Sequence, residues 1–512
     1  MRMRPVSMLS ASLGITLLLS ACGSTQPKPY TKEEQQLQIS ADKATMYEDQ
    51  EPVTRPITFY EAAARALKYN LDYRLKLMES ALSAKLRDVS SHEMLPRIVA
   101  GTGIAARSND SGGTSIGIED RQVSLRPSTS EERFHMLSNL GLSWSLLDFG
   151  VAYYRTQQRS DQILMAEERR RKVAQNVLQD VRNAYWRALA AQRLKPEVDR
   201  LLERTQKALG AAREAEQKGL MPRQQILAYQ RALLDSVYLL TIRRQDLELS
   251  QAELAALMSL PPGVPMVLAE MPEQVLPQQT VEVGRLEQLS LENRPEIAEE
   301  WYRKRVNAND LKVAKAQLWP NIGLDAGLQY DTNTFLYNNY WSQIGLTVSV
   351  NLVKLLQYPL LNATQDAQAH ADDMRRVALS MAILTQVRVG LLRYRLALQE
   401  MQFAEDGLRV DTSLLDYARA AQTTTFGSEL ELIRSEGRYL LSRYQREAAY
   451  SNAQAAWGRL YNSIGFDIMP EAIERGDIAT LASEIERTVN RQEQTNLLVI
   501  AQGAPNAEAA RP

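Results

Sequence analysis

The chain has 512 residues, of which 45% are hydrophobic and 24% charged, and its 60 Lys and Arg nearly balance its 61 Asp and Glu. This balance argues against a nucleic-acid-binding protein, which needs a basic face to neutralise phosphates. A single Cys excludes an intrachain disulfide and any zinc or redox site built on paired cysteines, and three His leave little for a histidine-based metal or catalytic centre.

Residues 1–21 have the pattern of a secretory signal peptide. Two arginines precede an apolar run from about Met8 to Leu19, which is too short for a stable membrane-spanning helix. The run ends in Leu19-Ser-Ala-Cys22, which resembles the bacterial lipobox. This resemblance implies cleavage before Cys22, a covalent lipid on its sulfur, and acylation (palmitate) of the new N-terminus, which together suffice for stable anchoring. Gly23 and Ser24 follow in place of the aspartate of an inner-membrane retention signal, so the expected location is the outer membrane.

Residues 22–56 are polar and hold several prolines, so we expect an irregular N-terminal arm there. Beyond Cys22 no uninterrupted apolar run approaches 18 residues, and no membrane-spanning helix is expected. Two regions then resemble each other, 57–263 and 284–466, with a proline-rich connector at 264–283 between them. In each, a helical tract ends in Leu95-Pro96 or Trp319-Pro320 and is followed by a strand pair and a longer helical tract. A repeat of more than 200 residues is too long for a solenoid and indicates an internal duplication.

Four segments alternate apolar residues with polar residues or glycine, which predicts β-strands at about 97–107, 138–148, 321–330 and 342–352. In the third, Ile322, Leu324 and Ala326 alternate with Gly323, Asp325 and Gly327. Such alternation over about ten residues is typical of a transmembrane barrel strand. It is equally typical of a soluble sandwich whose apolar face is core. The strands alone leave both interpretations open.

The stretch 151–219 holds one proline, Pro196, and the stretch 360–426 holds none, which predicts helices on the order of 100 Å long. Their apolar residues recur at three- and four-residue steps, as in coiled-coil seams. The expected seam residues are Val173, Val177, Val181, Ala184 and Ala188 in the first helix and Ile383, Val387, Leu391, Tyr394, Leu398 and Met401 in the second.

Long paired helices, duplicated and with a strand pair inserted in each half, resemble the TolC-type outer-membrane factor family over about residues 57–466. The supporting motifs are the two proline pairs before the strands, the strand exit Leu147-Asp-Phe-Gly150, and the hairpin tip Gly219-Leu220 with Ile226-Leu-Ala228. The resemblance implies an α+β membrane protein: a long α-helical coiled-coil barrel plus four transmembrane β-strands per chain, completed to a 12-stranded barrel as a homotrimer. Physical reasoning favours the trimer independently, because four strands cannot close a barrel and open edges are not tolerated in lipid.

The function that the resemblance implies is a passive exit duct in the cell outer membrane, with helices extending into the periplasm. It would be the channel of a tripartite efflux system for small molecules or drugs. Its partners would be its own copies, a periplasmic adaptor, an inner-membrane transporter and outer-membrane lipid, with no nucleic acid. No enzyme activity, metal or cofactor is expected besides the lipid at Cys22, since the sequence lacks a Walker loop, GxSxG and clustered His or Cys. One alternative is the outer-membrane component of type I protein secretion; another, of a different class, is a lipid-anchored coiled-coil scaffold without channel activity.

The resemblance also implies a closed periplasmic tip with a ring of acidic side chains. The first hairpin offers Gln224 and Gln225 at the matching positions. In the second, Glu429 and Glu431 are the candidates for the ring and Arg434 for a residue that ties the tip shut. Acids in a first helical turn are equally explained by the helix dipole. Three further residues, Gly219, Leu220 and Gly427, are candidate adaptor contacts at the hairpin tips, and residues 467–512 are expected to form a polar C-terminal extension of unassigned function.

Overall fold

The structure, a computed structural model, describes residues 28–48, 50–114, 116–123, 126–220, 222–261, 263–270, 276, 282–422, 429–466, 473 and 476–501. The chain divides into two units, Met1–Gln50 and Glu51–Pro512. In the first unit the structure describes helix α2 (Lys32–Met46), which begins at a capping box formed by Thr31 and Glu34. The arm expected to be irregular therefore holds a helix. Its start signal, Thr31 followed three residues later by Glu34, outweighs the polar composition.

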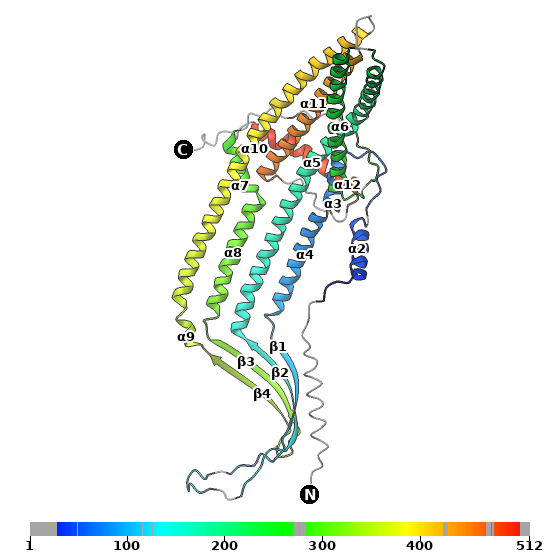
Figure 1. The fold of residues 1–512 in the computed structure, drawn as a ribbon. Helices are drawn as coiled ribbons and strands as arrows, with labels where there is room; N and C mark the ends of the chain where they lie inside the picture. Colours follow the sequence, from blue (N-terminus) through cyan, green and yellow to red (C-terminus); the bar gives the residue numbers. More distant parts are fainter. Residues whose placement is uncertain are drawn as a thin grey trace, which may run out of the picture. The chain divides into compact units, whose positions relative to one another are not determined.

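The second unit repeats one order of elements in its two halves (Figure 1). The short helices agree in length, since α3 and α7 have 11 residues each and α4 and α8 have 22 each. The first half contains α3 (Phe59–Tyr69), α4 (Leu71–His92), β1 (Arg97–Ala106), β2 (Phe134–Ser145), α5 (Leu146–Gln217) and α6 (Arg223–Leu257). The second contains α7 (Val283–Asn293), α8 (Pro295–Ala316), β3 (Asn321–Asp331), β4 (Tyr340–Ser349), α9 (Leu352–Leu355), α10 (Tyr358–Gln422) and α11 (Glu429–Ile464), and is followed by α12 (Ile478–Ala501).

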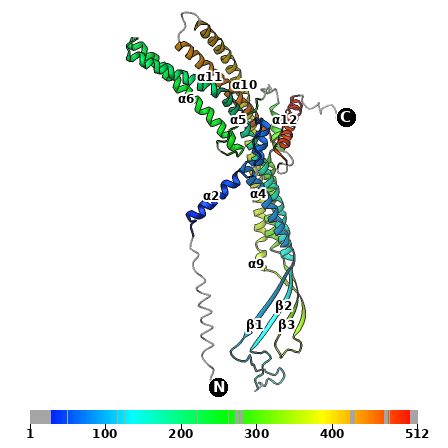
Figure 2. The ribbon, with the colours of Figure 1, turned by 90° about the vertical axis from the view of Figure 1, so that its right-hand side faces the viewer.

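The long helices pack side by side in two tiers. Next to the sheet, α4 contacts α5, α5 contacts α8, and α8 contacts α10. Farther away, α6 pairs with α5, α5 with α11, and α11 with α10, which forms the two hairpins seen splayed apart in Figure 2. At 1.5 Å per residue, the 72 residues of α5 span about 108 Å. Helix α5 therefore belongs to both tiers and links the sheet to the hairpins.

Coiled-coil seams hold these helices together. Most of the predicted seam residues are buried, and Val173, Leu398 and Met401 are partly buried against the core, which confirms the prediction. Helix α6 adds a strict heptad of buried residues, each worth about 1.5–3 kcal/mol when removed from water. These residues are Ile226, Leu233, Leu240, Leu247 and Leu254.

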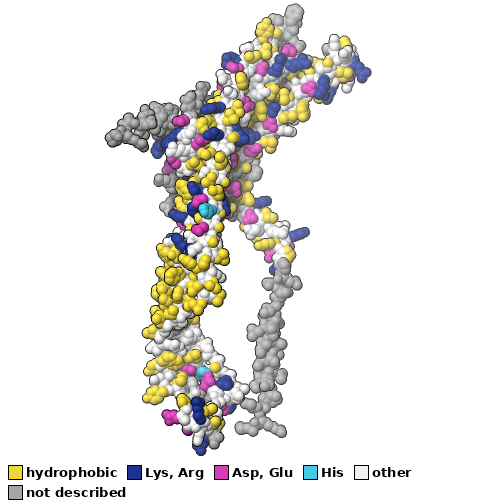
Figure 3. Space-filling view, turned by 90° about the vertical axis from the view of Figure 1, so that its left-hand side faces the viewer, with side chains coloured by type: hydrophobic (Ala, Val, Ile, Leu, Met, Phe, Trp, Pro, Cys, Tyr) yellow, Lys and Arg dark blue, Asp and Glu magenta, His cyan; other side chains and the backbone are white. Residues whose placement is uncertain are grey.

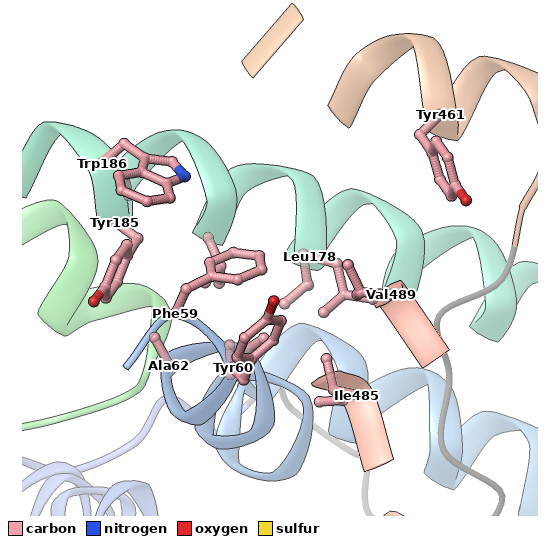
Figure 4. Packing of buried hydrophobic residues seen from close by; sticks show 14 of the residues in the cluster. Phe59, Tyr60, Ala62, Leu178, Tyr185, Trp186, Tyr461, Ile485 and Val489 are labelled. Carbon is pink, nitrogen blue, oxygen red and sulfur yellow. The ribbon is translucent and has the colours of Figure 1, made fainter. Parts of the chain in front are cut away.

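The same core becomes aromatic where α3, α5, α11 and α12 meet, and we call this part the aromatic core (Figure 4). Trp186 packs edge-to-face on Tyr185 and on Tyr450, with ring centroids 5.5 and 5.1 Å apart. The connector reaches this region through a parallel bridge between Ile57 and Leu268. We call the layer formed by α3 and α12 the equatorial layer.

Helix α12 corrects the expectation of a purely polar extension at 467–512. Its side chains Ile478, Leu481, Ile485 and Val489 are buried in the aromatic core, and the helix packs against α3. These positions follow the three- and four-residue spacing of an amphipathic helix. The stripe is short and its flanks are polar, so average composition hides it.

The four strands form one antiparallel sheet in the order β1-β2-β3-β4, which leaves β1 and β4 at its edges. Two strands differ from their predicted ranges. Strand β2 spans Phe134–Ser145 and not 138–148. It ends at Ser145 because the Ser145 hydroxyl accepts a hydrogen bond from the Asp148 amide and caps α5. Strand β4 spans Tyr340–Ser349 and not 342–352, because Asn351 caps the short helix α9.

Candidate functional site

The register of the sheet gives it one apolar and one polar face. Leu140 pairs with Ala100 on one side and with Leu328 on the other, so the apolar side chains align across neighbouring strands. The only hydroxyls of β1 and β2 on this face, those of Thr102 and Ser138, lie 2.6 Å apart and bond to each other. The opposite face carries glycines and polar residues, among them Asn139, Asp325, Gln329, Gln343 and Thr347.

None of the residues that the structure describes covers the apolar face. Ile98, Ile344 and Leu346 are 69%, 81% and 70% exposed. Figure 3 shows hydrophobic side chains gathered around the level where the helices meet the sheet, while charged ones lie on the helices beyond and at the loop end. In a soluble sandwich this face would be core, so its exposure favours the other interpretation that the sequence left open, a transmembrane strand set.

Aromatic side chains lie at both ends of the apolar face. Tyr330 pairs with Tyr340 next to the loops, and both are exposed. At the other end, the Trp144 ring packs edge-to-face on Phe149 at 5.9 Å, and its indole N–H donates to the Met94 carbonyl. An apolar band between two aromatic girdles is the pattern of a strand that crosses a bilayer.

Both the sheet and the long helices leave edges without a partner. The sheet ends in β1 and β4, whose outer N–H and C=O groups have no partner strand in the described chain. Beside them α4 exposes Leu75, Met78, Leu82 and Val89 at helical spacing. Helix α10 exposes a heptad series on its side of the unit, Leu396, Phe403, Val410 and Tyr417. Such seams are built to receive another helix.

By length and composition, α10 also holds a stretch apolar enough to cross a membrane, and it is the one helix of the described residues that does. Polar and charged side chains interrupt the apolar residues of α10, so no uninterrupted apolar run marks this stretch in the sequence. The apolar side chains of α10 that are exposed include Val377, Met381 and Leu392.

The tip of the first hairpin is set by a glycine in the left-handed region. Gly219 has φ +62°, its amide donates to Glu216, and the Leu220 amide donates to Ala215, both at 3.0 Å. These bonds close α5 with a Schellman motif. Leu220, which follows, is 68% exposed and available to a partner. Gly427, the candidate at the other tip, lies outside the described residues, as does Cys22.

The structure separates the three candidates for the aperture. Glu429 forms an ion pair of 2.7 Å with Arg204 of α5, and the same guanidinium pairs with Glu436 at 2.9 Å. Glu431 pairs at 3.1 Å with Arg438 of its own helix. Arg434 is exposed in a groove beside Leu201 and Leu240. Arg204 therefore joins α11 of the second hairpin to α5. The sequence did not indicate this contact, because no local motif links residues that are 225 positions apart.

A buried ion cluster lies at the other end of α11, where α8 begins. Arg294 is 5% exposed and binds Glu296 through two N–H groups at 2.6 and 2.9 Å, while the Lys172 ammonium lies 3.0 Å from the same carboxylate. Burial by itself raises the pKa of Glu296, but the Arg294 hydrogen bonds and the two cations outweigh it and lower the pKa to about 2.

This cluster predicts acid sensitivity. The pKa of Glu296 is 4.5 in its ordinary state and about 2 in the fold, so its stabilisation is complete above pH 4.5 and is lost as pH falls towards 2. The full effect is about 3 kcal/mol at 1.36 kcal/mol per unit. In urea titrations of the detergent-solubilised protein, we expect Glu296→Gln to lower the unfolding free energy at pH 7 and to flatten its fall between pH 5 and 3. The control Asp406→Asn removes an exposed pair with Arg409 and should change neither. Equal pH dependence in both variants would contradict the assignment.

Comparisons with known proteins agree with this geometry. Residues 74–259 match the family model described as Outer membrane efflux protein. The fold is similar to the Campylobacter jejuni CmeC outer membrane channel, at 11% identity and a TM-score of 0.63, over 86% of this chain and 94% of that one. It is also similar to the open state of the Neisseria gonorrhoeae MtrE outer membrane channel, at 16% identity and a TM-score of 0.59, over 80% and 88% of the two chains.

A third similar structure is the Vibrio cholerae outer membrane protein VceC, at 15% identity and a TM-score of 0.57, over 80% of this chain and 96% of that one. A search of curated proteins returns no match. The predicted fold class, long coiled-coil helices with four antiparallel strands per chain, is confirmed.

Proposed function

We propose that this chain forms a passive outer-membrane exit duct. Two findings support the proposal: residues 74–259 match the Outer membrane efflux protein family model, and the fold is similar to that of outer-membrane channels. The observation that carries the proposal is the sheet with one exposed apolar face between aromatic girdles and one polar, glycine-rich face. The first face suits lipid and the second suits an aqueous lumen.

The duct is a ring of three copies. An open sheet edge in lipid leaves backbone groups without hydrogen bonds, so β1 of one copy pairs with β4 of the next. The exposed seams of α4 and α10 lie on the corresponding sides of the unit and close the helical part in the same way. Three four-stranded sheets make a 12-stranded barrel. A barrel of this size is wide enough for an open lumen, whereas side chains fill the interior of an eight-stranded barrel.

The duct serves a tripartite efflux system and exports small molecules, including drugs. The chain carries no motif for energy conversion, so an inner-membrane transporter would supply it through a periplasmic adaptor. The adaptor contacts the hairpin tips, where Leu220 is exposed beside Gly219 and where Gly427 lies in sequence between α10 and α11. The scaffold alternative does not account for the uncovered apolar face of the sheet, which a soluble protein would bury.

The test combines mass and conductance. Native mass spectrometry in detergent should give three times the chain mass, and the purified protein should conduct ions across a planar bilayer. A monomer that does not conduct would overturn the proposal.

The lipid at Cys22 is a separate part of the proposal. We expect Cys22→Ala to lose labelling by radioactive palmitate but to stay in the outer membrane after alkaline carbonate extraction, because the barrel holds without lipid. The matched control Ser24→Ala should keep the label. Release of Cys22→Ala into the soluble fraction would show that the acyl chains alone hold the protein, against a barrel.

A further inference from the structure

A polar groove lies between α5, α10 and α11, at the level where α11 ends and α8 begins. It has a volume of about 760 Å³. Its wall combines four cationic side chains with amides; the cations are Lys172, Arg294, Arg393 and Arg459. Glu400 is the one carboxylate in its wall.

The groove opens on the side opposite the equatorial layer. On α11, Tyr461 lines a cavity together with Phe59 of α3 and Ile485 of α12, and Arg459 lies two residues before it, about 200° around the helix. On α5, Leu178 lines the same cavity, and Asn176 lies two residues before it, again about 200° away. In a closed ring the equatorial layer must lie outside, because inside it would fill the lumen. The groove therefore faces the lumen, and this step rests on the proposed function.

The cations of the groove are not all neutralised. Lys172 and Arg294 share Glu296, whereas Arg393 and Arg459 form no ion pair with any residue that the structure describes. The carboxylates nearby are Glu400 in the wall and Asp180, which interacts with Arg459 electrostatically without reaching ion-pair distance. Four cations against three carboxylates, Glu296 included, leave a positive excess on each chain.

The amides of the groove present donors. The Asn462 side-chain nitrogen donates to the Asn176 oxygen at 3.1 Å and to the Gln179 oxygen at 2.9 Å. Because both oxygens already accept a bond, the two side-chain nitrogens are left to donate to something else. Guanidinium groups bind carboxylate and phosphate oxygens through strong charge-assisted hydrogen bonds, and neighbouring amide N–H groups add further donors.

We propose that this groove is an anion-binding site in the channel wall, which holds small multivalent carboxylates or phosphates during passage. Arg393 and Arg459 supply the charge, and Asn176 and Gln179 supply directional hydrogen bonds. Three copies of the site would lie at one level of the lumen, which would also make the channel select for anions.

The test uses citrate and inorganic phosphate as probes. In planar bilayers, citrate added to KCl should reduce the wild-type conductance, and the double variant Arg393→Gln, Arg459→Gln should need about tenfold more citrate for the same block. Calorimetry with the detergent-solubilised protein should show the same loss of citrate binding. If citrate binds and phosphate does not, the site holds carboxylates, and the reverse result assigns it to phosphates. The control Arg409→Gln removes an exposed arginine of α10 outside the groove and should keep wild-type block.

The outcomes separate this inference from the proposed function. A wild-type channel that conducts but neither binds nor is blocked by either probe would overturn the anion site and leave the channel intact. Calorimetric binding that the double variant loses, in a protein that never conducts, would support the site and overturn the channel. If the Arg409→Gln control lost as much citrate block as the double variant, the effect would come from the net charge of the channel, and the site would be overturned.

Discussion

Replacing Ile344 by arginine should prevent the protein from assembling in the membrane. The side chain is 81% exposed in the middle of β4, on the apolar face and opposite Ala326. One arginine on the lipid face at the middle of the bilayer destabilises a transmembrane barrel by about 2–4 kcal/mol. A ring of three copies would carry that cost three times. We therefore expect little or no SDS-resistant trimer in the outer-membrane fraction of cells that express Ile344→Arg.

The neighbouring residue provides the matched control. Gln343 lies on the polar face opposite Gly327, so Gln343→Arg introduces the same side chain in the same strand but directs it to water. This variant should form trimer at the wild-type level and unfold at nearly the same urea concentration. If the two arginines were tolerated equally, or if Gln343→Arg were the more harmful, the apolar face would not be in lipid.

The second large effect is expected at the hairpin tip, where Arg204→Ala should raise single-channel conductance several-fold. Arg204 bridges Glu429 and Glu436 and so ties the start of α11 to α5. The side chains of Arg204 and Glu429 are 35% and 45% exposed, so the pair contributes at most about 1 kcal/mol to stability and the variant should fold normally. A hairpin released from α5 can move outward and widen the aperture. Unchanged conductance in a folded trimer would remove Arg204 from this role.

Two further variants distinguish a tie between helices from a ring of acids. Arg231→Ala breaks an exposed pair with Asp235 within α6 and should leave conductance unchanged. Glu431 pairs with Arg438 within α11, so Glu431→Ala does not free the hairpin from α5. If the tie controls the aperture, only Glu429→Ala should approach the effect of Arg204→Ala. If Glu429→Ala and Glu431→Ala raise conductance equally, the acidic ring is the better account.

The parts of this fold that follow a local period were predictable from the sequence. Alternation located the strands, and the three- and four-residue steps of Val177, Val181 and Ala184 located a seam that the structure buries. Helix ends were less predictable: Leu146 and Leu147 read as a continuing strand, yet the Ser145 cap starts α5 at Leu146. One hydroxyl decided that boundary.

The candidate sites depend on contacts that no local pattern encodes. Arg204 meets Glu429 only because α5 and α11 pack in one particular register, and four groups of α5, α10, α11 and the α7–α8 junction meet in the anion groove. Likewise, the apolar stripe of α12 has meaning only once α3 is beside it. The Arg204–Glu429 pair, the groove and the α12–α3 contact all depend on long-range packing. A single sequence predicts the type of each element but not which elements lie next to it.

The central claim is that the two faces of the sheet meet lipid and water, and cysteine accessibility tests it most directly. The chain has one cysteine, Cys22, which the proposed lipid would block, so single cysteines can be placed at the adjacent positions Asp325 and Leu324 of β3. Asp325 lies on the polar face and Leu324 on the apolar face. With a charged, membrane-impermeant thiol reagent added to open channels in a bilayer, conductance should fall for Asp325→Cys and stay constant for Leu324→Cys. Block at Leu324→Cys with none at Asp325→Cys would contradict a barrel with this lumen.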